Sequence, residues 1–438
     1  MSTPLHSKVY PITTAINTAD HLEIGGCDVA ELAKQFGTPL YVFDEVTLRT
    51  QAQGFLNAFG SRYSASRVVY ACKAFINVGL ARYFADLGIG FDVVSGGELA
   101  VLKAAGVNLS TVDFHGNNKT RQEIQQAVEW GTGHFVIDSF HELQMLNEAA
   151  AALDRVQPVL IRVSPSIDPH THRLTTTGVL DSKFGFPIET GQADQAIREV
   201  MAAKNLDLRG LHFHLGSPIF ELEPYTEAIE RVLRFAAQMR EYGLELNRFS
   251  PGGGFAIAYT EDDAPPTQDA YAEAIVGALV DGCQSHGLPL PELTIEPGRS
   301  LSGPAGVAVY TVGAIKEIPG VRTYVAVDGG MGDNIRPALY GSQYIAIAAS
   351  RASAPATETV TIAGKYCESG DVLVTDASLA PVVADDLIAI PASGAYAPSM
   401  ASSYNLNGRP AIVMVADGKA SLIRRRESYE DMMAQDVI

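Results

Sequence analysis

Residues 67–94 read RVVYACKAFINVGLARYFADLGIGFDVV, and this stretch contains one complete strand–helix–strand unit. Apolar, β-branched runs at 67–71 and 90–94 predict two short strands. Between them, apolar residues recur at helical spacing from Ile76 to Leu87, and a glycine follows the last of them. The stretch therefore predicts a strand, a helix and a second strand in immediate succession.

The same unit recurs along the first two thirds of the chain. The first four predicted strands start 21 to 23 residues apart, and helix-compatible sequence separates each strand from the next. Eight alternating strand–helix units predict an α/β fold with a closed parallel (β/α)8 barrel of the TIM type, over residues 46–300. The six further strands are predicted at 111–114, 134–137, 158–163, 211–214, 247–250 and 293–296.

After Arg299 the strands continue but long helices no longer separate them. This pattern predicts a C-terminal antiparallel β domain over 301–438, with Asp417-Gly418 as a hairpin turn. The extended run at 39–43 predicts that the N-terminal segment, 1–45, joins this domain. The strands are predicted at 324–327, 359–362, 372–374, 387–390 and 411–415.

Composition narrows the function classes. The 438 residues are 47% hydrophobic, enough for two or three domains with a large core. Fifty acidic against 32 basic side chains give a formal net charge of −18, which argues against nucleic-acid and membrane partners. The four cysteines form no C-x-x-C pair, the N-terminus lacks an apolar core, and the longest apolar stretch, 303–315, is too short to span a bilayer. We therefore expect a cytoplasmic protein.

Polar residues follow all eight predicted barrel strands. Since barrel chemistry lies at the C-terminal ends of the strands, eight polar ends favour an active site, although a single one would usually be a structural cap. In chain order they are Lys73, Asp92, His115-Gly-Asn-Asn-Lys119, Asp138, Arg162, His214, Gly252-Gly-Gly254 and Glu296-Pro-Gly-Arg299.

Several of these residues have a specific chemical interpretation beside a plainer one. Lys73 follows an apolar strand, where a neutral amine could form an imine, although such a lysine is more often a surface residue. The glycines at 252–254 suit a phosphate or a simple turn. Glu296 could bind a protonated pyridine nitrogen or be a buried structural glutamate.

His212 and His214 lie two residues apart on a strand and therefore face the same way, into the barrel. They could be metal ligands, or one could lie in the core while the other stacks on a cofactor ring. An imine lysine, a phosphate loop, an acid for a ring nitrogen and a stacking imidazole together indicate pyridoxal 5'-phosphate as the cofactor.

Longer motifs resemble the diaminopimelate decarboxylase family, whose members are alanine-racemase-like, fold type III pyridoxal-phosphate enzymes. The resemblance covers nearly the whole chain, from about Gly37 to Asp436. The motifs are Tyr70-Ala-Cys-Lys-Ala, Asp92-Val-Val-Ser-Gly-Gly-Glu-Leu, His115-Gly-Asn-Asn-Lys, Asp168-Pro-His-Thr-His, Asp181-Ser-Lys-Phe-Gly, His214-Leu-Gly-Ser, Glu296-Pro-Gly-Arg-Ser, Asp328-Gly-Gly-Met, Asp333-Asn-Ile-Arg-Pro-Ala-Leu-Tyr and Cys367-Glu-Ser-Gly-Asp.

The resemblance implies a homodimer whose active sites are completed across the interface, with no metal. Lys73 would hold the cofactor covalently, and Cys367 of the neighbouring subunit would return a proton to the substrate carbon. The other cofactor-binding residues would be His214, Ser217, Gly253, Gly254, Glu296, Pro297, Gly298, Arg299 and Tyr396. Substrate would contact Arg299, Arg336, Tyr340, Glu368 and Tyr396.

The implied reaction is decarboxylation of meso-2,6-diaminoheptanedioate at its D-centre to L-lysine and carbon dioxide, the last step of lysine biosynthesis. Arg336 and Glu368 suit the second amino-acid head of this small-molecule substrate, which carries one carboxylate and one ammonium. The sequence departs from the family pattern at Leu174, Thr175 and Asn407-Gly-Arg-Pro410, and we interpret the loop after Asp168 as a lid or structural loop.

Four alternatives remain open at this stage. A related fold type III decarboxylase would act on ornithine, arginine, lysine or carboxynorspermidine, although Arg336 with Glu368 argues against it. An amino-acid racemase would need a base on each face of the ring. A metal-dependent barrel hydrolase would use His212 and His214 as ligands. A homologue that has lost the cofactor would only bind partners, and the presence of Lys73, Glu296 and Cys367 argues against it.

Overall fold

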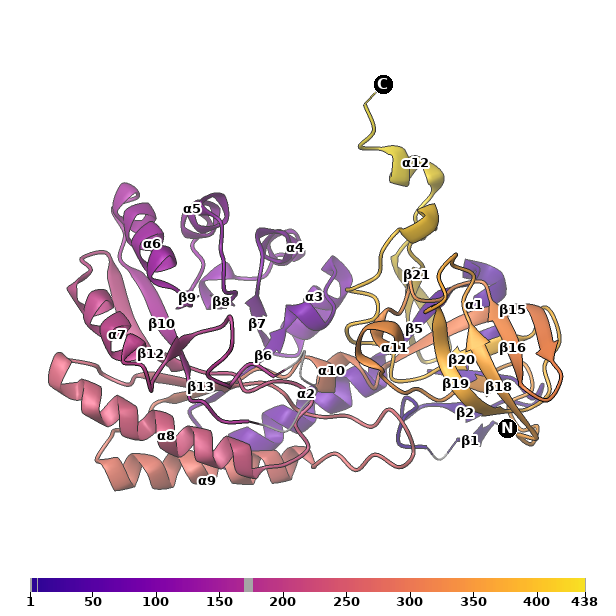
Figure 1. Ribbon diagram of the computed structural model, residues 1–438, viewed down its shortest axis with the longest axis horizontal. Coiled ribbons are helices and arrows are strands. Elements are labelled where there is room, and N and C mark those ends of the chain that lie inside the picture. The colour runs from indigo at the N-terminus through magenta and orange to yellow at the C-terminus, as the bar shows by residue number, and fades with distance from the viewer. Residues whose placement is uncertain (1, 6, 169–175, 438) are drawn as a thin grey trace. The chain divides into compact units, whose positions relative to one another are not determined.

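The computed structural model describes residues 2–5, 7–168 and 176–437, and the chain divides into two compact units (Figure 1). The barrel unit comprises Ala52–Ala256 and Pro265–Gly298, and the β unit comprises Met1–Gln51, Ile257–Ala264 and Arg299–Ile438. The predicted lid loop, including His170, His172, Leu174 and Thr175, falls almost entirely outside the described residues.

The barrel unit contains eight parallel strands that close on themselves. The last strand pairs with the first, with Leu293 opposite Ser66, and β10 pairs with strands on both sides. Each of the eight predicted strands coincides with an observed one, so the predicted TIM-type barrel is confirmed. The strands are β6 (Ser66–Ala71), β7 (Gly90–Val93), β8 (Val112–Phe114), β9 (His134–Ile137), β10 (Gln157–Ser164), β12 (Leu206–His212), β13 (Arg248–Gly252) and β14 (Glu292–Ile295).

Helices cover the outside of the barrel, and α8 packs alongside α9 (Figure 1). Because both faces of each strand are covered, the strands consist of nearly continuous apolar residues instead of an alternating pattern. A short strand, β11 (Phe186–Pro187), extends the end of β10. The helices are α2 (Glu45–Gly60), α3 (Val78–Asp86), α4 (Gly96–Ala105), α5 (Arg121–Trp130), α6 (Phe140–Ala152), α7 (Gln192–Ala202), α8 (Glu223–Met239) and α9 (Gln268–His286), with 3-10 turns at Cys72–Ala74, Leu109–Thr111 and Arg240–Tyr242.

Side-chain caps fix where several of these helices begin. Thr120 and Glu123 form a reciprocal capping box at the start of α5. Ser139 caps α6, because its hydroxyl accepts from the Glu142 amide at 3.2 Å. The Glu142 carboxylate accepts instead from the Asp138 amide and from Lys119, so it does not bond the backbone of its own N-cap residue.

The β unit contains a sheet in the order β19-β18-β16-β15-β5-β21-β22, with β20 pairing with β15 and with β17. The predicted C-terminal strands are all present, and the run at 39–43 joins the sheet as β5, as expected. Most pairings are antiparallel, but β16–β18 and β5–β21 are parallel. The strands are β5 (Leu40–Asp44), β15 (Gly306–Ile318), β16 (Arg322–Val327), β17 (Ile347–Ala348), β18 (Glu358–Ala363), β19 (Val372–Leu379), β20 (Leu387–Ile390), β21 (Ala411–Ala416) and β22 (Lys419–Arg424).

The hairpin between β21 and β22 has the turn that the sequence predicts. Asp417 and Gly418 both have positive φ, 50° and 72°, which is the geometry of a two-residue hairpin turn that Asp-Gly favours. A second, small sheet near the N-terminus packs its apolar side chains into the core of the same unit. It contains β1 (Thr3–Pro4), β2 (Ala15–Ile16), β3 (Leu22–Ile24) and β4 (Cys27–Asp28), and the helices of the β unit are α1 (Val29–Phe36), α10 (Arg299–Ser302), α11 (Arg336–Tyr340) and α12 (Tyr429–Met433), with a 3-10 turn at Tyr404–Leu406.

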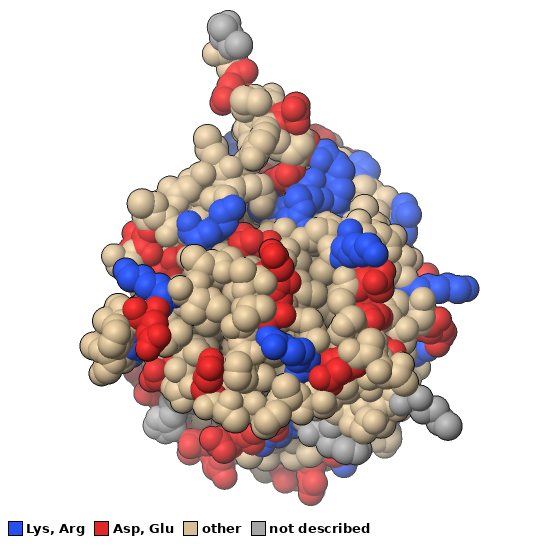
Figure 2. Space-filling view, turned by 90° about the vertical axis from the view of Figure 1, so that its right-hand side faces the viewer, with Lys and Arg blue, Asp and Glu red and all other residues tan. Residues whose placement is uncertain are grey.

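Acidic and basic side chains are interspersed on the face drawn in Figure 2, where charges of both signs adjoin tan regions. The arginine run at 424–426 is part of such a mixture: Arg425 pairs with Asp431, and Arg426 donates to the Pro39 carbonyl at 2.7 Å. Within the described part of the chain, no helix combines the length and apolar character that a membrane span needs.

Candidate active site

Four polar side chains meet inside the barrel at the ends of its strands. Glu296 directly follows β14, and its Oε1 accepts from Ser250 Oγ at 2.7 Å. Its Oε2 lies 3.2 Å from His212 Nε2, and His115 Nε2 lies 3.8 Å from Oε1. The rings of His115 and His212 pack edge to face at 4.8 Å. The carboxylate is thus buried with a hydrogen-bond partner on each oxygen.

The electrostatics of this cluster favour an ionised Glu296. Burial alone would raise the pKa of its carboxyl, but the interactions with His212 and His115 outweigh burial and hold the pKa well below its ordinary value. Burial lowers the pKa of His115 to about 3, so this imidazole is neutral at neutral pH. A buried carboxylate that is held in its ionised form is suited to bind a cation.

Further charged groups surround the cluster within the barrel unit. Burial and, next, the charge of Glu296 raise the pKa of Asp92 well above its ordinary value, whereas Lys73 acts in the opposite direction. Burial, followed by the charges of Lys73 and Arg162, lowers the pKa of His214 well below its usual range. The predicted residues Lys73, His214 and Glu296 therefore lie close enough to influence one another. The Lys73 side chain is exposed, on the 3-10 turn after β6.

A glycine cradle lies beside these groups. Gly254 has a φ of 104°, and a Cβ there would lie 2.6 Å from the Gly216 carbonyl oxygen. A Cβ on Gly253 would lie 2.1 Å from the carbonyl oxygen of Glu296. Both positions therefore require glycine, because the backbone of this turn packs directly against neighbouring carbonyl groups. The Gly253 amide donates to His214 Nδ1 at 3.3 Å.

The loop after Glu296 is attached to the strand that precedes Lys73. The Ala71 amide donates to the Pro297 carbonyl at 3.2 Å. A Cβ on Gly298 would lie 2.9 Å from the Ala71 Cβ, so this glycine permits close packing of the two segments. Pro297 and Gly298 thereby place the end of β14 against the end of β6.

Two residues at the polar strand ends have a structural explanation instead. Lys119 is fully buried and donates to the Glu142 carboxylate at 2.7 Å and to the Gly116 and Val136 carbonyls at 2.9 and 2.8 Å. Asp138 accepts from the Gly185 amide at 2.8 Å. These bonds tie neighbouring loops together, which is the structural capping role that a single polar strand end usually has.

In the β unit, two arginines and several tyrosines form a second cluster. Arg336 is buried and donates to Tyr344 Oη and Ser342 Oγ, both at 3.1 Å. Burial would lower its pKa, but the neighbouring tyrosines, Tyr259 foremost, outweigh burial and raise the pKa. In the part of the chain that the structure describes, no carboxylate forms an ion pair with Arg336. A buried cation of this kind suits an anionic ligand.

The same cluster includes the predicted residues Arg299, Tyr340 and Tyr396. The guanidinium of Arg299 lies 4.7 Å from the centre of the Tyr396 ring, and that of Arg336 lies 5.4 Å from the Tyr340 ring. Sequence reasoning missed two tyrosines of this cluster. Tyr259 accepts a hydrogen bond from Arg299, and Tyr344 accepts one from Arg336. No spacing or motif signals them, because an isolated tyrosine in a loop has no periodic pattern.

Cys367 and Glu368 lie in the loop between β18 and β19. Cys367 is exposed, whereas Cys27, Cys72 and Cys283 are buried. The Cys367 amide donates to Asn405 Oδ1 at 2.9 Å, and Glu368 Oε1 accepts from the Gly370 amide at 3.3 Å. The thiol is therefore held on an ordered loop and is accessible from outside this chain.

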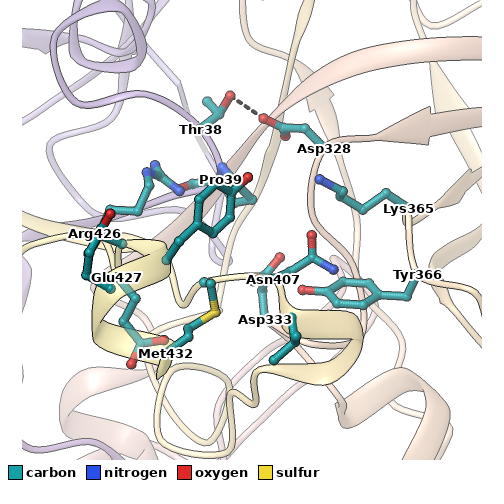
Figure 3. Close-up of a pocket in the computed structure, with 15 residues that line it drawn as sticks. Thr38, Pro39, Asp328, Asp333, Lys365, Tyr366, Asn407, Arg426, Glu427 and Met432 are labelled. Carbon is teal, nitrogen blue, oxygen red and sulfur yellow. Dashed lines mark hydrogen bonds between the residues drawn. The ribbon is translucent and has the colours of Figure 1, made fainter. Parts of the chain in front are cut away.

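A separate cavity of about 400 Å³ lies within the β unit (Figure 3). Lys365 and Tyr366 lie on one side of it, and Arg426 and Glu427 lie on the opposite side. None of the predicted cofactor-binding or substrate-binding residues lines it, so it is distinct from the cluster around Arg336.

Metal-binding geometry is found at one place among the described residues. His115, His212 and Glu296 offer ligand atoms that all lie within 4.8 Å of one another. This group differs from the His212–His214 pair of the metal-hydrolase alternative, because His214 is not part of it. Both oxygens of Glu296 already have protein hydrogen-bond partners, which provides an account of the cluster without a metal.

The barrel, the glycine cradle and the buried carboxylate together fit the barrel class of pyridoxal-dependent decarboxylases. A family model described as "Pyridoxal-dependent decarboxylase, pyridoxal binding domain" matches residues 46–303. More particularly, the chain belongs to the diaminopimelate decarboxylase family. It is 45% identical to the diaminopimelate decarboxylase of Bacillus subtilis (strain 168), over 97% of both chains, and 42% identical to that of Synechocystis, over 99% of this chain and 94% of the other.

Solved structures agree with this assignment. The crystal structure of diaminopimelate decarboxylase from M. jannaschii in complex with L-lysine is 37% identical, covers 98% of each chain and has a TM-score of 0.92. That of the Helicobacter pylori enzyme with L-lysine is 30% identical, covers 93% and 98% of the chains and has a TM-score of 0.84. The family resemblance inferred from the motifs is confirmed.

Proposed function

We propose that this chain is a cytoplasmic enzyme that decarboxylates meso-2,6-diaminoheptanedioate at its D-centre, with pyridoxal 5'-phosphate as cofactor, to L-lysine and carbon dioxide in the last step of lysine biosynthesis. The observation that carries the proposal is the buried Arg336, which has no carboxylate partner among the described residues. Lysine, ornithine and arginine carry only a cation at their distal end, whereas this substrate carries a carboxylate there. An unpaired buried cation would favour the substrate with the carboxylate.

The cofactor would be held by groups of the barrel unit. Lys73 would link to it through its amine, the turn at Gly253 and Gly254 would hold its phosphate with Ser217, and Glu296 would pair with the ring nitrogen. His214 would stack on the ring, and Pro297, Gly298, Arg299 and Tyr396 would complete the site. The pKa values support a shared site, because the charges of Lys73 and Glu296 both act on Asp92 and on His214.

When bound, pyridoxal 5'-phosphate supplies an electron sink for the pair of electrons that the departing carboxylate leaves behind. The protein residues would select and orient the substrate. Arg336, with Arg299, Tyr340 and Tyr396, would bind the distal carboxylate, and Glu368 the distal ammonium. Only a correctly oriented α-carboxylate is then in position to leave.

A second subunit completes the proposal. We infer a homodimer in which Cys367 of one chain would give a proton to the substrate carbon at the site of the other. The exposed position of this thiol supports the inference, since the other three cysteines are buried. A thiol is a suitable proton donor near neutral pH.

The test is carbon dioxide and lysine release from meso-diaminopimelate by the purified chain with pyridoxal phosphate, beside the Lys73→Ala variant. Parallel assays with ornithine, arginine and lysine examine the related decarboxylases. Lysine formed by the wild type alone supports the proposal. Activity on another amino acid with none on diaminopimelate would overturn the assignment of Arg336, and no activity on any of the four would overturn the enzyme proposal.

A further inference from the structure

We propose that His212 and Ser250 are positioning residues that hold the Glu296 carboxylate in one orientation and thereby keep the ring nitrogen of the cofactor protonated. This inference rests on the proposed function, in which Glu296 pairs with that nitrogen. It goes further by assigning the control of the nitrogen to two residues that would not touch the cofactor nitrogen themselves. A plainer interpretation is that both are only core side chains with satisfied hydrogen bonds.

Two hydrogen bonds hold the Glu296 carboxylate, one on each oxygen. Ser250 Oγ donates to Oε1 at 2.7 Å, and His212 Nε2 lies 3.2 Å from Oε2. The two donors come from neighbouring strands, β13 and β12, and both are buried. Each oxygen is therefore fixed by a different strand, so the carboxylate can neither rotate nor exchange its oxygens without breaking a bond.

The surroundings of the His212 ring determine its tautomer. Nδ1 has no hydrogen-bond partner among the described residues, whereas Nε2 faces Glu296. A proton on Nδ1 would be buried without an acceptor, which is costly. In the neutral imidazole the ring proton is therefore assigned to Nε2, from which His212 donates to Glu296. A hydrogen bond from a neutral donor stabilises the carboxylate without neutralising it.

Glu296 has no ion pair with a lysine or arginine among the described residues; its close partners there are His212, His115 and Ser250. The charges that face it from the packed strands are Arg162, which lies near Asp138 at 3.7 Å, and the second carboxyl group, Asp92. A protonated ring nitrogen would supply the missing positive charge. Fixing Glu296 as an anion therefore favours the protonated ring.

The experiment measures the ring nitrogen directly. Holoenzyme is loaded with ¹⁵N-labelled pyridoxal 5'-phosphate, and the ¹⁵N resonance is recorded for wild type, His212→Leu, His212→Gln and Ser250→Ala. The matched control is His134→Gln, because His134 also lies on a barrel strand but contacts Asp113 and Arg248 instead. Kinetics with meso-diaminopimelate and metal analysis accompany each sample.

The expected result separates positioning from a merely structural role. In His212→Leu the resonance moves toward the unprotonated position and kcat falls about tenfold to a hundredfold, the factor that a hydrogen bond to a charged group corresponds to, while KM changes little. His212→Gln, which keeps a donor, recovers part of both. Ser250→Ala shifts the resonance in the same direction, and His134→Gln leaves it at the wild-type position.

Three outcomes would overturn the inference. One is a wild-type resonance in both His212→Leu and Ser250→Ala, whatever their kcat. Another is an equal shift in His134→Gln, since that would indicate general loosening of the barrel. The third is a transition metal in the wild type that is lost in His212→Leu. If His212→Leu does not fold, the ¹⁵N resonances of Ser250→Ala and His212→Gln test the inference in its place. Failure of wild-type Lys73 to bind the cofactor would instead overturn the proposed function.

Discussion

At the residue scale, Asp333 has an unusual environment for a carboxyl group. It is buried, and burial raises its pKa from 3.8 to about 7 although the Gly330 amide donates to it at 2.9 Å. The unfolded chain would ionise this group near its ordinary value, while the folded chain keeps the proton until about pH 7. Its contribution to stability therefore falls as the pH rises from about 4 to about 7 and is constant above that range.

We predict that Asp333→Asn removes this pH dependence, because asparagine resembles the protonated acid. The gain in free energy of unfolding over wild type should be larger at about pH 8 than at about pH 5, by about 2 kcal/mol. Chemical denaturation of both proteins at the two pH values gives this difference. A gain that is the same at both would contradict the raised pKa.

A second prediction at this scale concerns Arg336. Replacing it with methionine should lower kcat/KM for meso-diaminopimelate by about a hundredfold to a thousandfold, because the distal carboxylate of the substrate would lose its partner in a buried site. The kcat/KM of Arg336→Lys should lie between those of the wild type and Arg336→Met, since lysine keeps the charge but lacks the planar guanidinium group. Arg351→Met, which removes a partner of Asp386, serves as the control. An unchanged kcat/KM in Arg336→Met would exclude this role.

At the scale of elements, the Lys119–Glu142 pair connects the loop after β8 with α6. Both side chains are fully buried, and their nitrogen and oxygen lie 2.7 Å apart. Lys119→Met should lower the free energy of unfolding by about 3 kcal/mol, because it leaves a buried carboxyl without its partner. The double variant Lys119→Met/Glu142→Leu should recover most of this loss. Denaturant unfolding of the two single variants and the double variant forms the cycle, and additive losses would show that the pair is not coupled.

At the scale of the whole molecule, the proposal that the active site is shared between two subunits makes a quantitative prediction. Lys73→Ala and Cys367→Ala homodimers should each be nearly inactive. Mixed and allowed to exchange, half of the dimers become heterodimers with one intact site, so the mixture should recover about a quarter of wild-type activity. The carbon dioxide assay before and after mixing measures this recovery. No recovery, with exchange shown by differently tagged chains, would place Lys73 and Cys367 in the same chain's site.

The sequence predicted the regular part of the fold because regular structure has a period. Eight apolar strands separated by helices specify a closed barrel, and Asp417-Gly418 specifies a hairpin. The small sheet formed by β1–β4 was not predicted, because strands of two or three residues are too short to show alternation. Barrel closure and the insertion of β5 between distant strands depend on packing. In the sequence, only the extended character of 39–43 indicated this packing.

The same contrast holds for the candidate site. The proximity of Lys73, His214 and Glu296 could be predicted because the strand ends of a barrel meet at one place. Lys119 looked identical in sequence, yet it forms a structural ion pair, since only the fold determines whether a strand-end side chain faces the mouth or a neighbouring loop. Tyr259 and Tyr344 could not be found, because they are adjacent to the arginines in space but not in sequence.

The position of β5 has a consequence for how the chain is made. β5 lies between β15 and β21, although residues 40–44 leave the ribosome long before either partner. Every barrel strand is synthesised in the interval. The nascent chain therefore carries an unpaired strand of five buried residues through most of translation, and only the emergence of 411–416 covers its second edge. During that interval β5 is an obvious segment for a chaperone to shield.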